Sequence, residues 1–121
     1  MTPIQIKALD KFKANLLEFL NGPSRNLYVT SGRSISVYTR KGVHLVNNKK
    51  TMTLDIGSIC IGRGRKGQGL GMATVNLMHE MNPFEATYIE SILNNRFKDR
   101  LIKEGWLIVP DSCPTSVYKE K

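Results

Sequence analysis

The sequence predicts an α+β domain with a mixed, mostly antiparallel central sheet flanked by helices. Apolar residues recur at helical spacing in two separate segments, whereas residues 26–61 alternate with a period of two and are rich in β-branched and aromatic residues. The turn signals between these strands are too short for crossover connections, so we expect the strands to pair antiparallel. A length of 121 residues fits one domain over residues 1–121.

The first element is an amphipathic helix over residues 2–20. Thr2 is suited to cap it, and Pro3 suits its first turn. The helix ends at "NGP", and its apolar stripe consists of Leu9, Phe12, Leu16 and Leu20.

Four strand-like stretches follow the helix: "NLYVT", "SISVYTR", "VHLV" and "TMTLDIGSICI". The intervening "SG", "KG" and "NNKK" are typical of hairpin turns. Gly57, inside the last and longest strand, indicates a bulge or a close approach to the backbone.

The second half begins with a glycine-rich loop, "IGRGRKGQGLG", at residues 61–71. The helix after it ends at Asn82 and Pro83, and "ATYIESIL" is typical of a buried strand. A helix over residues 95–104 ends at Gly105, and the stretches "WLIV" and "SVYKEK" are the final strands.

Charge and cysteine content bound the environment of the protein. The chain has 18 Lys and Arg against 10 Asp and Glu, a net charge of +8, so we expect a negatively charged partner. Cys60 and Cys113 are the two cysteines, and the apolar strand around Cys60 predicts a buried free thiol in a reducing, cytoplasmic setting. No stretch approaches the ~18 to 20 apolar residues that span a bilayer, so we expect no membrane partner.

Two nucleotide sites are compatible with the glycine loop. Gly62, Gly64 and Gly67 spell GxGxxG between a strand and a helix, and Glu90 lies 23 residues beyond Gly67, as in a dinucleotide-binding fold. That fold needs parallel βαβ units, and the short antiparallel connections before the loop argue against it.

The second interpretation places a pyrophosphate on "KGQGLG", residues 66–71. The small residues Gly67, Gly69 and Gly71 let successive backbone N–H groups face one ligand, and the helix N-terminus adds partial positive charge. The structural alternative is a flexible basic turn whose glycines supply positive φ.

This loop resembles that of the GNAT superfamily of acetyl-CoA-dependent N-acetyltransferases. The family loop is Arg/Gln-x-x-Gly-x-Gly/Ala, preceded five positions before the Arg/Gln by an apolar strand residue. Ile61, Lys66, Gly69 and Gly71 occupy those places, with Lys in place of the usual Arg/Gln. The likeness extends over roughly residues 51–121.

A second family pattern is an Asn followed eleven residues later by Gly-aromatic, which Asn94, Gly105 and Trp106 match. The resemblance implies a GNAT-like fold in which two neighbouring strands splay apart and the pantetheine arm of acetyl-CoA inserts between them. Some of the implied contacts also suit roles that need no ligand, because strand isoleucines suit any core and Asn94 suits a helix cap. The implied cosubstrate contacts are Ile59, Cys60, Ile61, Lys66, Gly67, Gln68, Gly69, Leu70, Gly71 and Asn94.

The resemblance assigns the general base to Asp55. Some family members, notably the histone acetyltransferase branch, carry Glu six residues before the position matching Ile61, which is Asp55 here. An acceptor ammonium must lose a proton before it attacks, and a partly buried carboxylate is suited to take that proton. Because Asp is shorter than Glu, we expect a bridging water. A cross-strand ion pair and an outward-facing side chain are the alternatives.

The usual general acid of the family, a Tyr seven residues after the Asn, is replaced by Leu101. Tyr118 is then the candidate proton donor to the departing thiolate. Unassisted departure of the thiolate and loss of catalysis with retained binding are the alternatives. His44 and His79 lie far apart in the sequence without further metal ligands near them, so we expect no metal.

The predicted function is therefore direct transfer of acetyl from acetyl-CoA to an amine in a ternary complex. The surplus of positive charge favours an acidic or nucleic-acid-associated acceptor as the hypothesis, and a monomer and a homodimer both remain open. The alternatives are a basic nucleic-acid-binding module, whose affinity would fall steeply with salt, and an acetyl-CoA-binding protein without catalysis.

Overall fold

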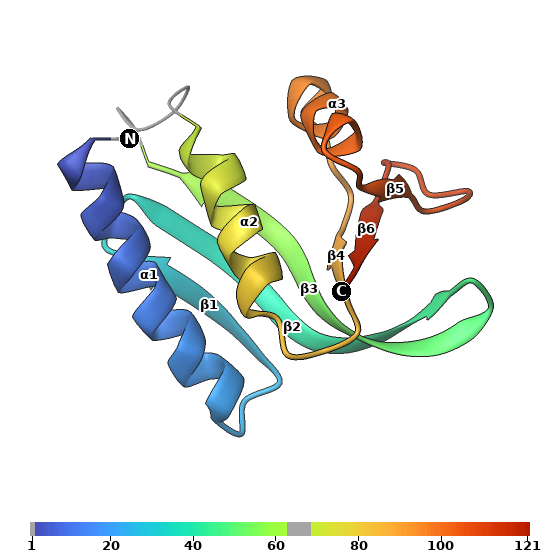
Figure 1. Ribbon diagram of the computed structural model, residues 1–121, viewed down its shortest axis with the longest axis horizontal. Helices are drawn as coiled ribbons and strands as arrows, with labels where there is room; N and C mark the ends of the chain where they lie inside the picture. The colour runs from blue at the N-terminus through green and yellow to red at the C-terminus, as the bar shows by residue number, and fades with distance from the viewer. Residues whose placement is uncertain (1, 63–68) are drawn as a thin grey trace.

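The computed structural model describes residues 2–62 and 69–121 and confirms the expected α+β class (Figure 1). Its elements follow the order helix, three strands, helix, strand, helix and two strands. They are α1 (Pro3–Asn21), β1 (Asn26–Ser31), β2 (Ile35–Val46), β3 (Lys49–Ile61), α2 (Leu70–Met81), β4 (Ala86–Ile89), α3 (Asn95–Lys103), β5 (Leu107–Ile108) and β6 (Val117–Glu120).

The described strands form one six-stranded sheet in the order β1-β2-β3-β4-β6-β5. Every neighbouring pair is antiparallel except β3 and β4, which run parallel and are connected through α2. The described part of the chain thus has one parallel pair, whereas a dinucleotide-binding fold is built from repeated parallel units. This topology contradicts the GxGxxG interpretation of the loop.

The strands β3 and β4 separate after a short region of pairing. Their register runs from Thr53 opposite Ala86 to Ile56 opposite Ile89, and β3 then continues to Ile61 paired with β2 but not with β4. Figure 1 shows the two strands diverging from this point. Along residues 57–61, the backbone edge of β3 that faces β4 therefore has no strand paired with it.

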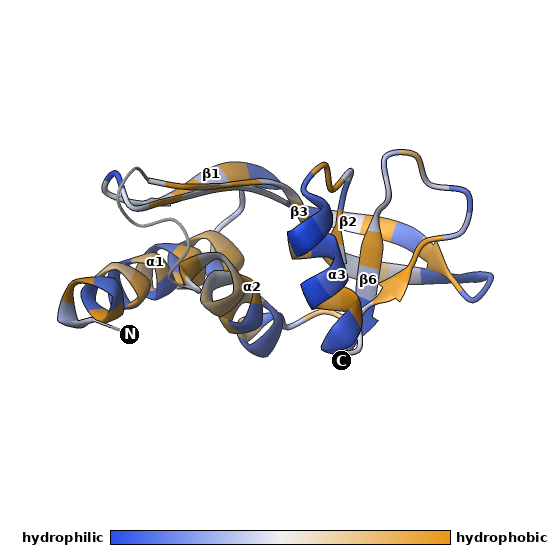
Figure 2. Cartoon of the chain, turned by 90° about the horizontal axis from the view of Figure 1, so that it is seen from above, coloured by the Kyte–Doolittle hydropathy of each residue, from blue (hydrophilic) through white to orange (hydrophobic). Residues whose placement is uncertain are grey.

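The two long helices α1 and α2 pack side by side on one face of the sheet (Figure 2). Phe12 and Leu16 of α1 are completely buried, as are Leu54 and Ile56 of β3, and all four belong to one apolar cluster. We call the face of β3 that carries Leu54 and Ile56 the helical face. Burial of each such side chain contributes about 1.5 to 3 kcal/mol of transfer free energy.

Several local predictions are confirmed. Thr2 caps α1 by accepting a hydrogen bond from the backbone N–H of Gln5, whose side chain accepts one in return from the backbone N–H of Thr2. Gly57 is the extra residue where the β2–β3 register shifts, and a Cβ on it would lie 2.9 Å from the ring of Tyr38. Gly105 has φ +97°, as expected for a residue that ends a helix in the left-handed region.

The predicted turn at "KG" is wrong, because β2 runs without interruption through Lys41 and Gly42 to Val46. Gly42 is needed in the strand because a carboxylate of β3 occupies the space beside it. The strand predicted over "ATYIESIL" is also shorter than expected, because it ends at Ile89 and Ser91 adopts a positive φ of 50°.

Candidate active site

A row of polar and aromatic side chains crosses the sheet on the face opposite Leu54 and Ile56. In the strand register, Arg40 of β2 lies opposite Asp55 of β3, Asp55 opposite Tyr88 of β4, and Tyr88 opposite Tyr118 of β6. Residues paired across neighbouring strands project from the same face, so the four side chains share it. We call this the polar face.

Asp55 is the centre of the row and is almost completely buried, with 2% of its surface exposed. One carboxylate oxygen, Oδ1, accepts a 2.6 Å hydrogen bond from the hydroxyl of Thr53. The other, Oδ2, lies 3.0 Å from Nε2 of His44 and 3.6 Å from the guanidinium of Arg40. The burial is deeper than the partial burial expected, because these partners close over the carboxylate and compensate for the loss of water.

Gly42 makes room for this arrangement. It lies on β2 between Arg40 and His44 on the same face, and a Cβ added to it would lie 2.3 Å from Oδ2 of Asp55. Real Cβ atoms essentially never approach that closely. The carboxylate therefore occupies the space that any other residue at position 42 would fill.

Arg40 links Asp55 to a second acid. Its guanidinium forms an ion pair with Glu90, which directly follows β4. Among the described residues, His44, Asp55 and Glu90 each offer one potential metal ligand, a ring nitrogen or a carboxylate oxygen. These three atoms lie within 4.8 Å of one another. These neighbours of His44 were not expected, because they lie on other strands. In the folded chain Arg40 supplies one positive charge between the two carboxylates.

His44 and Tyr88 complete the polar face. Their rings stack with centroids 3.8 Å apart and an angle of 3° between the planes. Burial, and secondly the charge of Asp55, raises the pKa of Tyr88 above the usual value for a phenol. Tyr88 therefore keeps its proton at neutral pH. Its only signal in the sequence is its place in an apolar strand.

The predicted acid Tyr118 stands one strand further from Asp55 than Tyr88 does. It is half-buried on β6, opposite Tyr88. Leu101, at the family's usual Tyr position, is completely buried in the apolar cluster. Position 101 accordingly belongs to the core and has no role in proton transfer.

The residues predicted to line the pantetheine arm lie on the part of β3 that pairs with β2 but not with β4. Ile59 and Ile61 are half-buried and pack against the apolar cluster. Cys60 is free and exposed, so the expected burial of its thiol is wrong. The reason is its place beyond the last β3–β4 pair, on the side of the strand that faces away from the helices.

The start of α2 follows the glycine loop. Gly69 adopts φ +78° and precedes the helix without any side-chain cap, which leaves the first N–H groups of α2 without acceptors of that kind. The side chain of Leu70 is buried, and a Cβ on Gly71 would make ordinary contacts with Ile61 and Phe97. Three predicted contacts, Lys66, Gly67 and Gln68, lie outside the described residues.

Gly62 and Asn94 each have a local structural role. A Cβ on Gly62 would lie 2.0 Å from the carbonyl oxygen of Arg33, so this glycine permits close packing against the β1–β2 turn. Asn94 caps α3, with its side-chain oxygen accepting a 3.0 Å hydrogen bond from the N–H of Phe97. The capping alternative is thus present in the fold, and contact between Asn94 and a cosubstrate stays a prediction.

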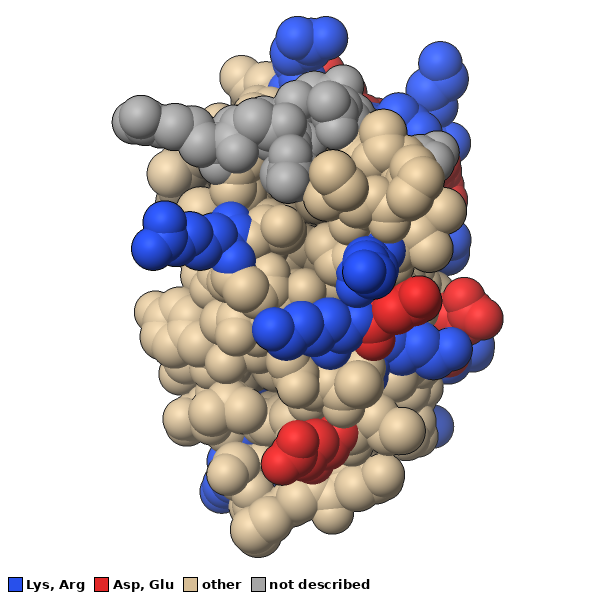
Figure 3. Space-filling view, turned by 90° about the vertical axis from the view of Figure 1, so that its left-hand side faces the viewer, with Lys and Arg blue, Asp and Glu red and all other residues tan. Residues whose placement is uncertain are grey.

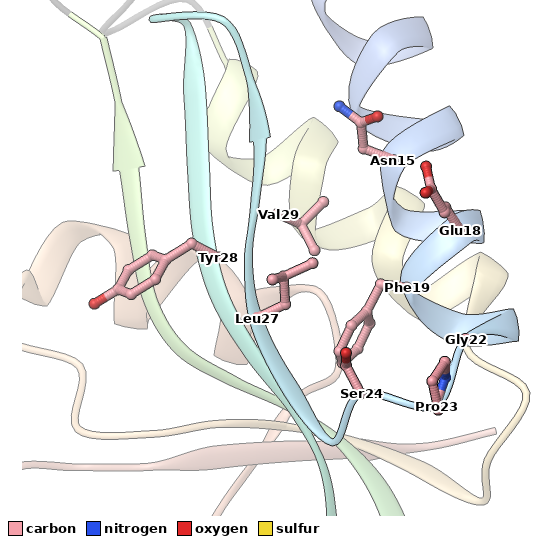
Figure 4. Close-up of a pocket in the computed structure, with 9 residues that line it drawn as sticks. All are labelled: Asn15, Glu18, Phe19, Gly22, Pro23, Ser24, Leu27, Tyr28 and Val29. Carbon is pink, nitrogen blue, oxygen red and sulfur yellow. The ribbon is translucent and has the colours of Figure 1, made fainter.

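A separate hollow of about 310 Å³ lies between the end of α1 and the start of β1 (Figure 4). Phe19, Leu27 and Val29 supply its apolar wall, and Asn15 and Glu18 stand at its rim. None of its lining residues is a predicted site residue, and none is on the row through Asp55. We assign no chemistry to it.

Comparison with solved structures identifies the architecture. The structure of a KacTA–DNA complex aligns with a TM-score of 0.57 at 18% identity, covering 94% of this chain and 79% of that chain. A mutant of the AtaT toxin, bound to the C-terminus of the antitoxin AtaR and to acetyl-CoA, aligns with a TM-score of 0.55 at 13% identity over 72% of this chain. The chain has the fold of the GNAT superfamily.

The GNAT fold is thus established at low sequence identity. The chain spans 58% of the length of the AtaT chain that it matches. Naa50 of Arabidopsis thaliana, in complex with the bisubstrate analogue CoA-Ac-MVNAL, aligns at 11% identity with a TM-score of 0.44, covering 100% of this chain and 94% of that chain. No protein-family model and no curated protein matches the sequence. Among the described helices of this GNAT fold, none has the length and apolar character needed to cross a membrane.

Proposed function

We propose that the protein is an N-acetyltransferase that moves acetyl from acetyl-CoA directly to an amine. The observation that carries the proposal is the position of the polar face. The buried, hydrogen-bonded Asp55 lies one residue before Ile56, where β3 and β4 cease to pair. A proton-accepting cluster and an open strand edge therefore adjoin each other, which is the juxtaposition that acetyl transfer needs.

Acetyl-CoA would occupy the gap between the two strands. The amides of its pantetheine arm are suited to pair with the free backbone edge of Ile59, Cys60 and Ile61, and its pyrophosphate with the N–H groups at the start of α2. Gly69 and Gly71 keep side chains away from that helix start. The cosubstrate would supply an acetyl group already activated as a thioester.

The polar face would manage the protons. The acceptor enters as an ammonium and must lose one proton to the Asp55 cluster before its nitrogen attacks. The departing thiolate gains a proton from a tyrosine of the same row. Tyr88 is favoured over Tyr118 for this role, because it stands one strand nearer to Asp55 and its ring stacks on that of His44. Acetyl passes directly to the amine in a ternary complex, without an acyl-enzyme.

The acceptor in this proposal is acidic or associated with nucleic acid. The chain carries a net charge of +8, and the strongly hydrophilic α3 (Figure 2) contributes Arg96, Lys98, Arg100 and Lys103 against one acid, Asp99. Figure 3 shows further Lys and Arg side chains on the side of the molecule where α1 lies, with acidic groups between them. The structural neighbour KacTA was solved with DNA, which supports testing nucleic acids as partners.

Isothermal calorimetry with acetyl-CoA, NADH and a short DNA duplex tests the binding part of the proposal. We expect micromolar binding of acetyl-CoA, no binding of NADH, and loss of acetyl-CoA binding in Gly69→Glu, because the new carboxylate would repel the pyrophosphate. Ser24→Glu, with the same added charge on an exposed residue between α1 and β1, is the control. If the protein bound DNA but not acetyl-CoA, the proposed enzyme function would be wrong and a nucleic-acid-binding function would take its place.

A screen of amines tests the catalytic part. Thiol release from acetyl-CoA is followed with a peptide N-terminus, a lysine side chain, a polyamine and an aminoacylated nucleotide as acceptors. We expect turnover with at least one of them, and faster turnover with the nucleotide at low salt than at high salt. If the protein bound acetyl-CoA tightly but acetylated none of these amines, it would be an acetyl-CoA-binding protein without catalysis.

A further inference from the structure

The buried state of Asp55 leaves a question about which group meets the acceptor amine. The side chain of Asp55 is 3% exposed, whereas that of His44 is 26% exposed. Thr53, His44 and Arg40 surround the carboxylate of Asp55. An amine arriving from solvent therefore meets His44, and meets Asp55 only after one of these side chains has moved.

We propose that His44 is the catalytic base of the polar face and that Asp55 is a positioning residue that acts through it. The inference rests on the proposed acetyl transfer and changes which atom receives the proton. Nothing in the sequence joins these two residues, because they lie eleven positions apart on two different strands.

The hydrogen bond between the two residues orients the ring. In the neutral imidazole, Nε2 carries the proton and donates it to Oδ2 of Asp55 over 3.0 Å, which leaves the lone pair on Nδ1. No partner for Nδ1 is found in the part of the chain that the structure describes. The stacked ring of Tyr88, 3.8 Å away, fixes the plane of the imidazole. A histidine held by a buried carboxylate in this way is suited to accept a proton at its other nitrogen.

Charged and titratable side chains from three strands surround His44. The titratable and charged groups that face it are Asp55 from β3, Arg40 from its own strand, Tyr88 from β4, and Glu90 directly after β4. These groups include two carboxylates, Asp55 and Glu90, and one guanidinium, that of Arg40. A proton that the ring accepts from the amine would lie beside these two carboxylates.

Protons and bonds balance in the proposed step. The ammonium of the acceptor gives one proton to Nδ1 of His44, and the freed nitrogen lone pair attacks the thioester carbonyl. The C–N bond forms and the C–S bond breaks, which releases CoA as a thiolate. The thiolate takes a proton from Tyr88, which regains one from the second N–H of the former ammonium. The imidazolium then loses its proton to solvent.

The test compares acetyl transfer by the wild type, His44→Ala and Asp55→Asn across pH, with the most reactive amine of the panel. We expect His44→Ala to lower kcat by about 100-fold or more, to lose the rise of rate with pH on the acid side, and to regain part of the rate when imidazole is added. Asp55→Asn should lower kcat less and shift that rise. His79→Gln, the other histidine, is the control and should keep the wild-type rate.

Nuclear magnetic resonance gives a readout that does not depend on activity. The chain has two histidines, so long-range ¹H–¹⁵N spectra with His79→Gln for assignment report the tautomer of His44 directly. We expect the Nε2–H tautomer in the wild type and a loss of that preference in Asp55→Asn. An Nδ1–H tautomer would overturn the inference.

The outcomes separate this inference from the proposed function. Full activity of His44→Ala together with an inactive Asp55→Asn would mean that Asp55 takes the proton itself, and only the role of His44 would be lost. Absence of turnover by the wild-type protein with every amine would overturn the proposed function, and the inference with it.

Discussion

Three consecutive residues of β3 are almost completely buried, but their surroundings differ. Leu54 and Ile56 face α1 and α2 and are enclosed by apolar side chains, whereas Asp55 between them faces His44 and Arg40 and is enclosed by polar ones. Apolar burial stabilises the fold, but burial of a carboxylate costs free energy that its partners only offset. This contrast indicates that the polar face is maintained for a reason other than stability.

The two faces also differ at β4, where consecutive residues contact two different histidines. Thr87 lies 2.8 Å from Nδ1 of His79 on the helical side, whereas the next residue, Tyr88, stacks on His44 on the polar side. Burial, with Lys121 and Lys119 nearby, lowers the pKa of His79. The helical side therefore disfavours a histidine proton, and the polar side surrounds its histidine with two carboxylates.

The largest effect on stability should come from the helical face. Leu54→Ala removes a completely buried side chain and should lower the free energy of unfolding by about 2 to 5 kcal/mol, measured by urea denaturation. Leu45→Ala, at a position 74% exposed, is the matched control and should change it by less than about 0.5 kcal/mol. If Leu54→Ala slowed acetyl transfer tenfold per folded molecule, the two faces would not be separable.

Gly42→Ala should have the largest effect on the polar face among variants that change neither Asp55 nor His44. The added Cβ would displace the carboxylate and break its geometry with His44, so we expect kcat to fall on the order of 100-fold. Val43→Ala, at the exposed neighbouring position of β2, is the control for strand composition. A crystal structure of Gly42→Ala with Asp55 in its original place and normal activity would contradict this role of the glycine.

A smaller effect should distinguish the two tyrosines. Tyr88→Phe removes the proposed donor and should lower kcat by about tenfold or more with little change in KM, measured by thiol release. Tyr118→Phe should retain most of the wild-type rate. The reverse order would restore Tyr118 as the general acid and remove Tyr88 from the mechanism.

The smallest effect should be a dependence of stability on pH through His79. Because its folded pKa is lowered, the unfolded chain binds more protons once the pH falls below about 6.5, and stability declines from there towards the lower folded pKa. At higher pH, His79 is neutral in both the folded and the unfolded chain, and it causes no loss of stability. Denaturation at several pH values should show a weaker decline in His79→Gln than in the wild type. Identical slopes would remove His79 as a cause.

Local sequence patterns predicted the elements of the helical face well. Helical spacing and the Thr2 cap located α1, and the stop at Asn82 and Pro83 located the end of α2. These signals act within a few residues along the chain, so that no knowledge of the tertiary structure is needed. The same patterns misled at Gly42, because a glycine that makes room for a carboxylate on the next strand looks like a turn glycine in sequence.

The polar face was only partly predictable. Asp55 stood out as an acid between apolar strand residues, but His44, Arg40, Tyr88 and Glu90 join it only through strand register and the bulge at Gly57. The alternation of buried and exposed residues along β2 does not show which residue of β3 lies opposite a given residue of β2. The prediction for Cys60 was wrong for the same reason, since the place where β3 and β4 separate is a property of the sheet.

The role of the polar face is tested most sharply by the effect of Asp55→Asn on chemistry and on cosubstrate binding in one preparation. We predict that the rate of acetyl transfer falls by at least about tenfold at neutral pH while the Kd for acetyl-CoA stays within about twofold of the wild type, because Asp55 serves proton transfer and does not face the strand edge that would hold the cosubstrate. A variant that transfers acetyl at the wild-type rate would contradict the assignment of the reaction to the polar face.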